Sequence, residues 1–212
     1  MNTITEIALG KAQRGIFTRE EAAFWVGNRG ARLDALLKRA VASNEVLRVH
    51  SKLYCLDERY LYKRINSLEL AQRIHGPSYV SLEMALSYHG WIPEAVYTIT
   101  SVTQGRSREF KTHFGAFSFT CIPQLKFFAG VRSVSEDESG AFFMAEPLKA
   151  LADYVYVQRC KWNSAAPVVE SLRVDPALLD ELTSEMFDEV SAAYKSGRVL
   201  QFLSGLRREL KL

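Results

Sequence analysis

The chain has 212 residues, of which 48% are hydrophobic and 24% are charged, a balance that excludes a disordered protein. No apolar run approaches the roughly 20 residues of a membrane-spanning helix, and the N-terminus lacks the basic start and apolar block of a signal peptide. The three cysteines have no CxxC spacing, and the four histidines have no metal-ligand spacing. We therefore expect a cytoplasmic protein without a disulfide framework, a metal or a cofactor.

The net charge of +3 is unevenly distributed along the chain. Residues 1–56 contain nine Lys or Arg and five Asp or Glu, so this segment carries +4 and the remaining residues sum to −1. A small basic segment in front of a nearly neutral body indicates a module that binds a polyanion, joined to a larger domain.

Two helices are predicted in the first 26 residues. Thr3-Ile4-Thr5-Glu6 has the spacing of a capping box, so the first helix should begin at Thr3. Thr18-Arg19-Glu20-Glu21 repeats this spacing and predicts a second helix that ends near Val26. The two glycines of Gly27-Asn28-Arg29-Gly30 then favour a turn, in which Asn28 could cap a third helix.

The third helix, expected to end near Ser43, is amphipathic. At about 100° per residue its apolar positions fall on one face, and its basic positions with two alanines fall on the other. The apolar face comprises Leu33, Leu36, Leu37, Ala40 and Val41, and the opposite face comprises Arg32, Ala35, Lys38, Arg39 and Ala42. Residues 45–56 alternate around His50-Ser51 and predict a β-hairpin. Three helices followed by a hairpin are the order of a winged helix-turn-helix domain, over residues 1–56.

A polar helical linker is predicted for residues 57–76, because Gly76-Pro77 ends a weakly amphipathic segment. Residues 77–212 then predict a mixed α/β domain that ends in helices. Ser81 should cap a short helix from Leu82 to His89, which Gly90 stops.

The middle of this domain is rich in predicted strands. They are AVYTITSV (residues 95–102), REFKTHF and AFSFTCI around Gly115, and KFFAGVRSV and AFFMA around an acidic turn at residues 135–140. After Pro147 the pattern is helical to about Gln158, and Pro176 occupies a first helical turn in the mostly helical C-terminal region. The fold class predicted for the whole chain is therefore α+β.

The basic face of the third helix is the main functional candidate. A helix that enters the major groove of DNA needs long cationic side chains, and small residues where its backbone approaches closely. The alternative is that this face is an ordinary solvent-exposed helix surface without a ligand. The three helices followed by a hairpin favour binding of nucleic acid. The predicted DNA-binding residues are Arg29, Arg32, Lys38 and Arg39 on and before the helix, with Arg48 and Lys52 on the hairpin.

A second basic segment, QGRSREFK, lies in the predicted second domain. Arg106, Arg108 and Lys111 in this segment could make an additional contact with DNA phosphates. An ordinary solubilising hairpin turn accounts for the same residues equally well.

An enzyme is the alternative to a binding protein. Glu94 precedes Glu109-Phe110-Lys111 by fifteen residues, and an acid followed by Glu-x-Lys is how some nucleases hold a divalent cation. A metal-dependent nuclease would then use Glu94, Glu109 and Lys111, although Glu109 and Lys111 could equally form a surface ion pair. No nucleophile elbow or phosphate-binding glycine loop is present, so we predict no catalytic residue.

One block of the second domain resembles a known family. The stretch YVSLEMALSYHGWIPEAVYTITSVT (Tyr79 to Thr103) is similar to the core signature of the AbiEi-family antitoxins of type IV toxin–antitoxin systems. The segments RSREF, AFSFTCI and AEPLKALADYV (Ala145 to Val155) fit the same family, and the resemblance covers nearly the whole chain. Lys52 stands where family hairpins often have the glycine of a Gly-x-Tyr ending.

The resemblance implies a bacterial autorepressor whose winged helix binds inverted repeats in duplex DNA upstream of its own operon. The second domain would antagonise a nucleotidyltransferase-like toxin without forming a stable complex with it. Within the family-like block, Tyr79, Ser81 and Glu83 are interpreted as capping and packing residues rather than catalysts. Trp91 is interpreted as a core residue.

Overall fold

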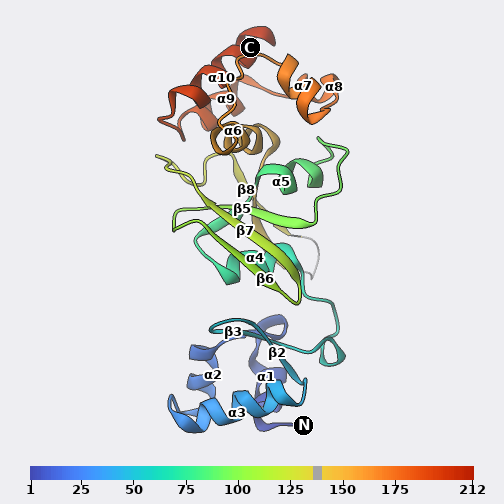
Figure 1. The fold of residues 1–212 in the computed structure, drawn as a ribbon, viewed down its shortest axis with the longest axis vertical. Helices are drawn as coiled ribbons and strands as arrows, with labels where there is room; N and C mark the ends of the chain where they lie inside the picture. The colour runs from blue at the N-terminus through green and yellow to red at the C-terminus, as the bar shows by residue number, and fades with distance from the viewer. Residues whose placement is uncertain (136–139) are drawn as a thin grey trace.

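The computed structural model describes residues 1–135 and 140–212. The molecule is elongated, with an N-terminal unit at one end and the C-terminal helices at the other (Figure 1). Residues 136–139 of the predicted acidic turn lie outside the described residues. Among the helices of the described residues, none is both long and apolar enough to cross a bilayer.

The N-terminal unit combines three helices with a small sheet. β3 lies between β1 and β2, and both pairings are antiparallel. Leu33, Leu37 and Ala40 of α3 are buried against the sheet and the other helices, as the amphipathic pattern predicts. Burial of each leucine contributes about 1.5–3 kcal/mol. The elements are α1 (Thr3–Lys11), β1 (Ile16–Thr18), α2 (Arg19–Val26), α3 (Ala31–Ala42), β2 (Val46–His50) and β3 (Leu53–Leu56).

One of the two predicted capping boxes is confirmed. The Thr18 hydroxyl accepts the Glu21 N–H, and the Glu21 carboxylate accepts the Thr18 N–H at 2.6 Å, at the start of α2. The box at Thr3 is wrong, because the N-cap of α1 is Asn2 and its side chain makes no capping bond. The backbone N–H of Asn2 donates to the Glu45 carboxylate at 2.7 Å, which ties the start of α1 to the turn between α3 and β2.

The turn between α2 and α3 forms as predicted, with one correction. Gly27 ends α2 with φ of 66°, a left-handed conformation in which glycine is unstrained. The N-cap of α3 is Gly30, so the predicted capping role of Asn28 is wrong. The Asn28 side chain instead accepts the Gly30 N–H at 2.9 Å and stabilises the turn from within.

The predicted hairpin is also present, but its sheet is covered on both sides. All four residues of β3 are buried. Tyr54 and Leu56 pack with the helices of the N-terminal unit, whereas Leu53 and Cys55 belong to the large core of the second unit. Burial raises the pKa of the Cys55 thiol to about 12, so this cysteine stays protonated. The hairpin is therefore fixed between the two units.

A six-stranded mixed sheet forms the centre of the second unit, in the order β6-β7-β5-β4-β9-β8. β5 is parallel to β7 and β4 is parallel to β9, whereas the other neighbours are antiparallel. The predicted strands are present, but the one predicted over KFFAGVRSV begins only at Val131, because residues 126–130 form a bend and a turn. The three-residue β4 was not predicted. The strands are β4 (Ser78–Val80), β5 (Thr98–Thr103), β6 (Arg108–Thr112), β7 (Gly115–Cys121), β8 (Val131–Ser135) and β9 (Ala141–Ala145).

The segment predicted as a linker is part of the second unit. Residues 57–76 contain a short 3₁₀ turn (Glu58–Tyr60) and α4 (Ser67–Ile74). Leu70, Ala71 and Ile74 of α4 are buried in the core of the second unit, where α4 packs on β4 and β9. Figure 1 shows α4 at the level of β6, in the part of the second unit nearest the N-terminal unit. An Arg14–Glu69 ion pair at 2.6 Å joins the two units at this place.

Helices cover the end of the sheet that is remote from the N-terminal unit (Figure 1). α5 ends as predicted, with Gly90 at φ of 72°, but the Ser81 side chain makes no capping bond to it. Pro147 and Pro176 occupy the first turns of α6 and α8 as predicted. The helices are α5 (Leu82–Tyr88), α6 (Pro147–Val157), α7 (Ala166–Leu172), α8 (Pro176–Leu179), α9 (Ser184–Ser191) and α10 (Gly197–Glu209).

Glu189 connects this helical region to the sheet. Its carboxylate accepts bonds at 2.9 and 2.7 Å from the Arg132 guanidinium of β8, and another at 2.9 Å from the Gly130 N–H. These contacts lower the pKa of Glu189 to about 2. Because its pKa is lower in the folded than in the unfolded protein, Glu189 stabilises the fold above about pH 4.5, and this contribution disappears as the pH falls towards 2.

We expect Glu189→Gln to lower the free energy of unfolding at pH 7 by about 1 kcal/mol, because the bonds are partly exposed to solvent. The variant and the wild type should converge in stability between pH 5 and pH 2. Urea titrations at four pH values in this range would measure the difference. A difference in the free energy of unfolding that stayed constant down to pH 2 would contradict a lowered pKa of Glu189 in the folded protein.

Candidate nucleic-acid interface

The outer face of α3 carries the basic side chains that the sequence analysis selected. Arg32, Lys38 and Arg39 are exposed, and none forms an ion pair with a described residue. Ala35 and Ala42 are exposed between them. The face lies at the end of the molecule that is remote from the second unit (Figure 1). It therefore presents unpaired positive charge with small residues, free of contact with the rest of the chain.

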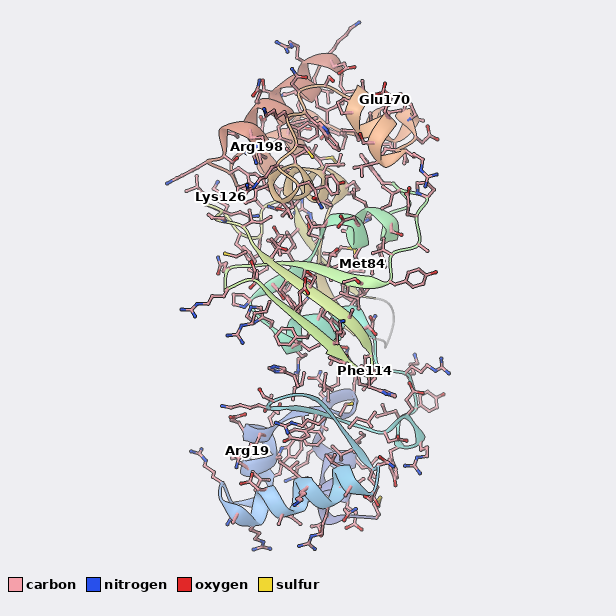
Figure 2. All side chains as sticks on the ribbon, viewed as in Figure 1. Arg19, Met84, Phe114, Lys126, Glu170 and Arg198 are labelled. Carbon is pink, nitrogen blue, oxygen red and sulfur yellow. The ribbon has the colours of Figure 1, made fainter. Side chains whose placement is uncertain are left out.

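Arg19, which the sequence analysis did not select, fixes the start of this face. Its guanidinium donates to the Asp34 carboxylate of α3 at 2.7 and 3.1 Å and to the Arg29 backbone carbonyl at 3.0 Å. Arg19 is the first residue of α2, and Figure 2 shows it in the N-terminal unit beside α3. One side chain thus sets the distance between α2, the turn and α3, and it leaves the exposed Arg29 side chain free to contact a ligand.

The hairpin contributes two further exposed cations with different surroundings. The Arg48 guanidinium donates to the Ser51 carbonyl at 3.1 Å and forms no ion pair with a described residue. Lys52 forms an ion pair of 3.4 Å with Glu20 at the start of α2. Of the two predicted hairpin contacts, Arg48 therefore retains its full charge for a ligand, whereas the charge of Lys52 is partly compensated.

The second basic segment lies beside the hairpin. The rings of His50 on β2 and Phe110 on β6 are in edge contact, with centroids 4.6 Å apart. Burial, followed by the charges of Arg108 and Arg48, lowers the pKa of His50. Arg48 and Arg108 are therefore close to the same imidazole, although they come from different units.

Arg106 and Lys111 complete this second basic segment, and both are exposed. The Arg106 carbonyl is hydrogen-bonded to His75 at 3.1 Å, which fixes the turn before β6. Figure 2 shows Phe114, in the turn between β6 and β7, near the N-terminal unit. Together with the contact between His50 and Phe110, this places β6 of the second basic segment beside the hairpin.

Of the three residues of the nuclease alternative, Glu94 has a partner in another part of the described chain. The Glu94 carboxylate accepts hydrogen bonds from the Arg173 guanidinium, which lowers the pKa of Glu94. Glu109 and Lys111 lie exposed on β6, and no ion pair joins these two described side chains. Among the described residues, no three His, Cys, Asp or Glu side chains are grouped as metal ligands.

Two residues of the family-like block, Tyr79 and Ser81, belong to a buried polar cluster. Asp153 of α6 is fully buried and accepts hydrogen bonds from the hydroxyls of Tyr79 at 2.9 Å and Ser81 at 2.8 Å. Tyr194 and Gln124 donate to its other oxygen at 2.5 and 3.0 Å. Ser81 is thus a buried hydrogen-bonding residue instead of the predicted helix cap, while Trp91, at 4% exposure, is the expected core residue.

Lys149 supplies the positive charge of the same cluster. It lies one helical turn before Asp153, fully buried, with Nζ 3.4 Å from the carboxylate and 2.8 Å from the Tyr194 hydroxyl. Burial lowers the pKa of Lys149, and the charge of Asp153 opposes this shift. Burial and the Asp153 charge raise the pKa of Tyr79 and Tyr194 well above the ordinary value, so their hydroxyls stay protonated as donors.

This cluster is a structural centre rather than a binding site, because neither charged side chain is accessible to solvent. It joins β4, α6 and the segment between α9 and α10. This cluster was not predicted, although Lys149 and Asp153 stand four residues apart in an otherwise apolar helix, which is a recognisable signal in the sequence.

No protein-family model and no curated protein matches this chain.

Proposed function

We propose that the N-terminal unit is a winged helix-turn-helix domain that binds duplex DNA. The observation that supports this most directly is the exposed α3 face, where Arg32, Lys38 and Arg39 are free of ion pairs. The tight Gly27–Gly30 turn before α3 and the β2–β3 hairpin after it fit the geometry of such a domain. Basic side chains on the helix would read the major groove, and the hairpin would contact flanking phosphates.

We further propose that the chain is a non-catalytic antitoxin and transcriptional autorepressor of a type IV toxin–antitoxin operon. This proposal is supported by the family-like block from Tyr79 to Thr103 and by the segment from Ala145 to Val155. Tyr79, Ser81 and Asp153, which come from these two segments, meet in the buried cluster. The DNA ligand would be an inverted repeat in the chain's own promoter, and the toxin would be a nucleotidyltransferase-like protein.

Salt dependence of DNA binding tests the first proposal. We expect the full chain to bind a duplex from its own promoter with an affinity that falls linearly in a log–log plot against salt. Each phosphate contacted should contribute about −0.9 to the slope, because binding releases condensed counterions. Fluorescence anisotropy at several salt concentrations would measure this slope. A signal that does not depend on DNA concentration, or a flat salt response, would contradict DNA binding.

A further inference from the structure

A groove of about 360 Å³ lies between α3 and the hairpin. Asp34 and Lys38 line it from α3, Arg48 and Ser51 line it from the hairpin, and Tyr54 also contributes to its lining. Arg19 closes it on the side of α2. The groove thus lies between two elements of the proposed DNA-binding surface, α3 and the hairpin, and Lys38 belongs both to the groove and to the exposed α3 face.

The charges that line this groove do not cancel. Asp34 is neutralised by Arg19 through the ion pair of 2.7 Å. Lys38 and Arg48 form no ion pair with a described residue, and the Arg48 guanidinium uses one donor on the Ser51 carbonyl. Two positive charges in one concave site therefore remain to be matched by an anion.

Tyr54 adds a neutral donor to the same site. Its ring is stacked on Phe17 in the core of the N-terminal unit, with centroids 5.8 Å apart, and the residue is only 7% exposed. Its hydroxyl makes no hydrogen bond to any described residue. The hydroxyl is not one of the buried polar atoms that lack a partner, so solvent or a ligand in the groove can reach it.

We propose that this groove binds a phosphoryl group through the Lys38 ammonium, the Arg48 guanidinium and the Tyr54 hydroxyl. Two cations and a hydroxyl donor suit the charge and the several acceptor oxygens of a phosphoryl group. The inference rests on the proposed function: if the chain binds duplex DNA, the phosphoryl group is a backbone phosphate of that duplex. A free phosphate has the same chemistry, and the experiment distinguishes these two sources.

Tyr54→Phe and Lys38→Met in the full chain test the site. Tyr54→Phe keeps the stack on Phe17 and removes only the hydroxyl, so the melting temperature without ligand should stay within about 2 °C of the wild type. We expect Tyr54→Phe to weaken binding of the promoter duplex about 3- to 10-fold, with an unchanged salt slope. Lys38→Met should weaken binding and make the slope less steep by about 0.9.

Orthophosphate is the second probe, and its binding is followed by the rise in melting temperature over matched chloride. Tyr62→Phe and Lys11→Met, which alter exposed side chains outside the groove, are the controls. Loss of duplex affinity in both groove variants supports a backbone phosphate. Loss of the orthophosphate effect alone supports a free phosphate in the same site. Wild-type behaviour of both variants with both probes would overturn the proposal.

The two proposals can fail separately. If the wild type binds no duplex, the DNA-binding function fails, while the orthophosphate measurement still tests the groove. If the wild type binds duplex and the groove variants bind it equally well, and none responds to orthophosphate, only the groove proposal fails.

Discussion

Asp153→Ala is expected to lower the free energy of unfolding by about 3–5 kcal/mol. The substitution leaves the fully buried Lys149 ammonium without its counter-charge, and it removes the acceptor of four further donors, from Tyr79, Ser81, Gln124 and Tyr194. Single domains are stable by only about 5–15 kcal/mol, so this loss is a large fraction of the total. Urea unfolding followed by circular dichroism would measure it.

Glu170→Ala is the matched control for this measurement. Glu170 is exposed on α7, as Figure 2 shows, and we expect its replacement to change the stability by less than about 0.5 kcal/mol. A urea midpoint for Asp153→Ala equal to that of the control would contradict the structural role of the cluster.

The double variant Lys149→Met, Asp153→Asn separates the charge from the hydrogen bonds. It leaves no buried charge, and the asparagine carbonyl can still accept from one of the buried hydroxyls. We therefore expect the double variant to be more stable than Asp153→Ala, since removal of both partners of a buried ion pair is less costly than removal of one. A double-mutant cycle with both single variants would give the coupling energy between the two charges.

The elements that were predicted from the sequence are those with local signals. The Thr18–Glu21 capping box and the leucine stripe of α3 are readable within a few residues, and the structure confirms both. The capping box at Thr3 has the same local signal and is absent. The helix is capped one residue earlier, at Asn2, whose carbonyl accepts the backbone N–H groups of Thr5 and Glu6. The spacing of a capping box alone therefore does not fix where a helix begins.

The parts that were not predicted depend on distant partners. β1 and β4 are three residues long and become strands only through pairing with β3, β5 and β9. The Asp153 cluster collects donors from residues more than 70 positions before it and about 40 after it. The groove between α3 and the hairpin requires the packing of the whole N-terminal unit, so the roles of Arg19 and Tyr54 were not readable from the sequence.

The exposure of Arg32, Lys38 and Arg39 was predicted, whereas the cluster was not, because exposed cations on an amphipathic helix need no tertiary partner to be recognised. The structure leaves Arg32, Lys38 and Arg39 unpaired on one face. The sequence pattern contained no sign that β6 would lie beside the hairpin. That neighbourhood depends on the contact between His50 and Phe110 across the two units.

Arg32→Ala is expected to weaken binding of the promoter duplex by about 1–3 kcal/mol, or about 5- to 150-fold in Kd, if Arg32 reads a guanine in the major groove. Arg39→Ala should weaken binding to all duplexes similarly and make the salt slope less steep by about 0.9, as expected for a phosphate contact. Anisotropy titrations with the promoter duplex and a scrambled duplex would separate the two roles. Wild-type affinity in both variants would contradict the assignment of α3 as the recognition helix.

Arg198→Ala is the control for charge removal, because Arg198 is exposed on α10 near the opposite end of the molecule (Figure 2). It should leave the affinity and the salt slope nearly unchanged. None of the three arginine substitutions should shift the melting temperature by more than about 2 °C, since Arg32 and Arg39 make no ion pair or side-chain hydrogen bond with any described residue.

The double variant Arg32→Ala, Arg39→Ala also separates the two activities proposed for this chain. If the proposed nucleotidyltransferase-like toxin is co-expressed, the double variant should still restore growth, because the substitutions lie at the end remote from the second unit and leave the Asp153 cluster intact. The same variant should no longer repress a reporter under the chain's own promoter. Loss of both activities in a folded variant would show that protection from the toxin requires the α3 face, and the assignment of antitoxin activity to the second unit would be wrong.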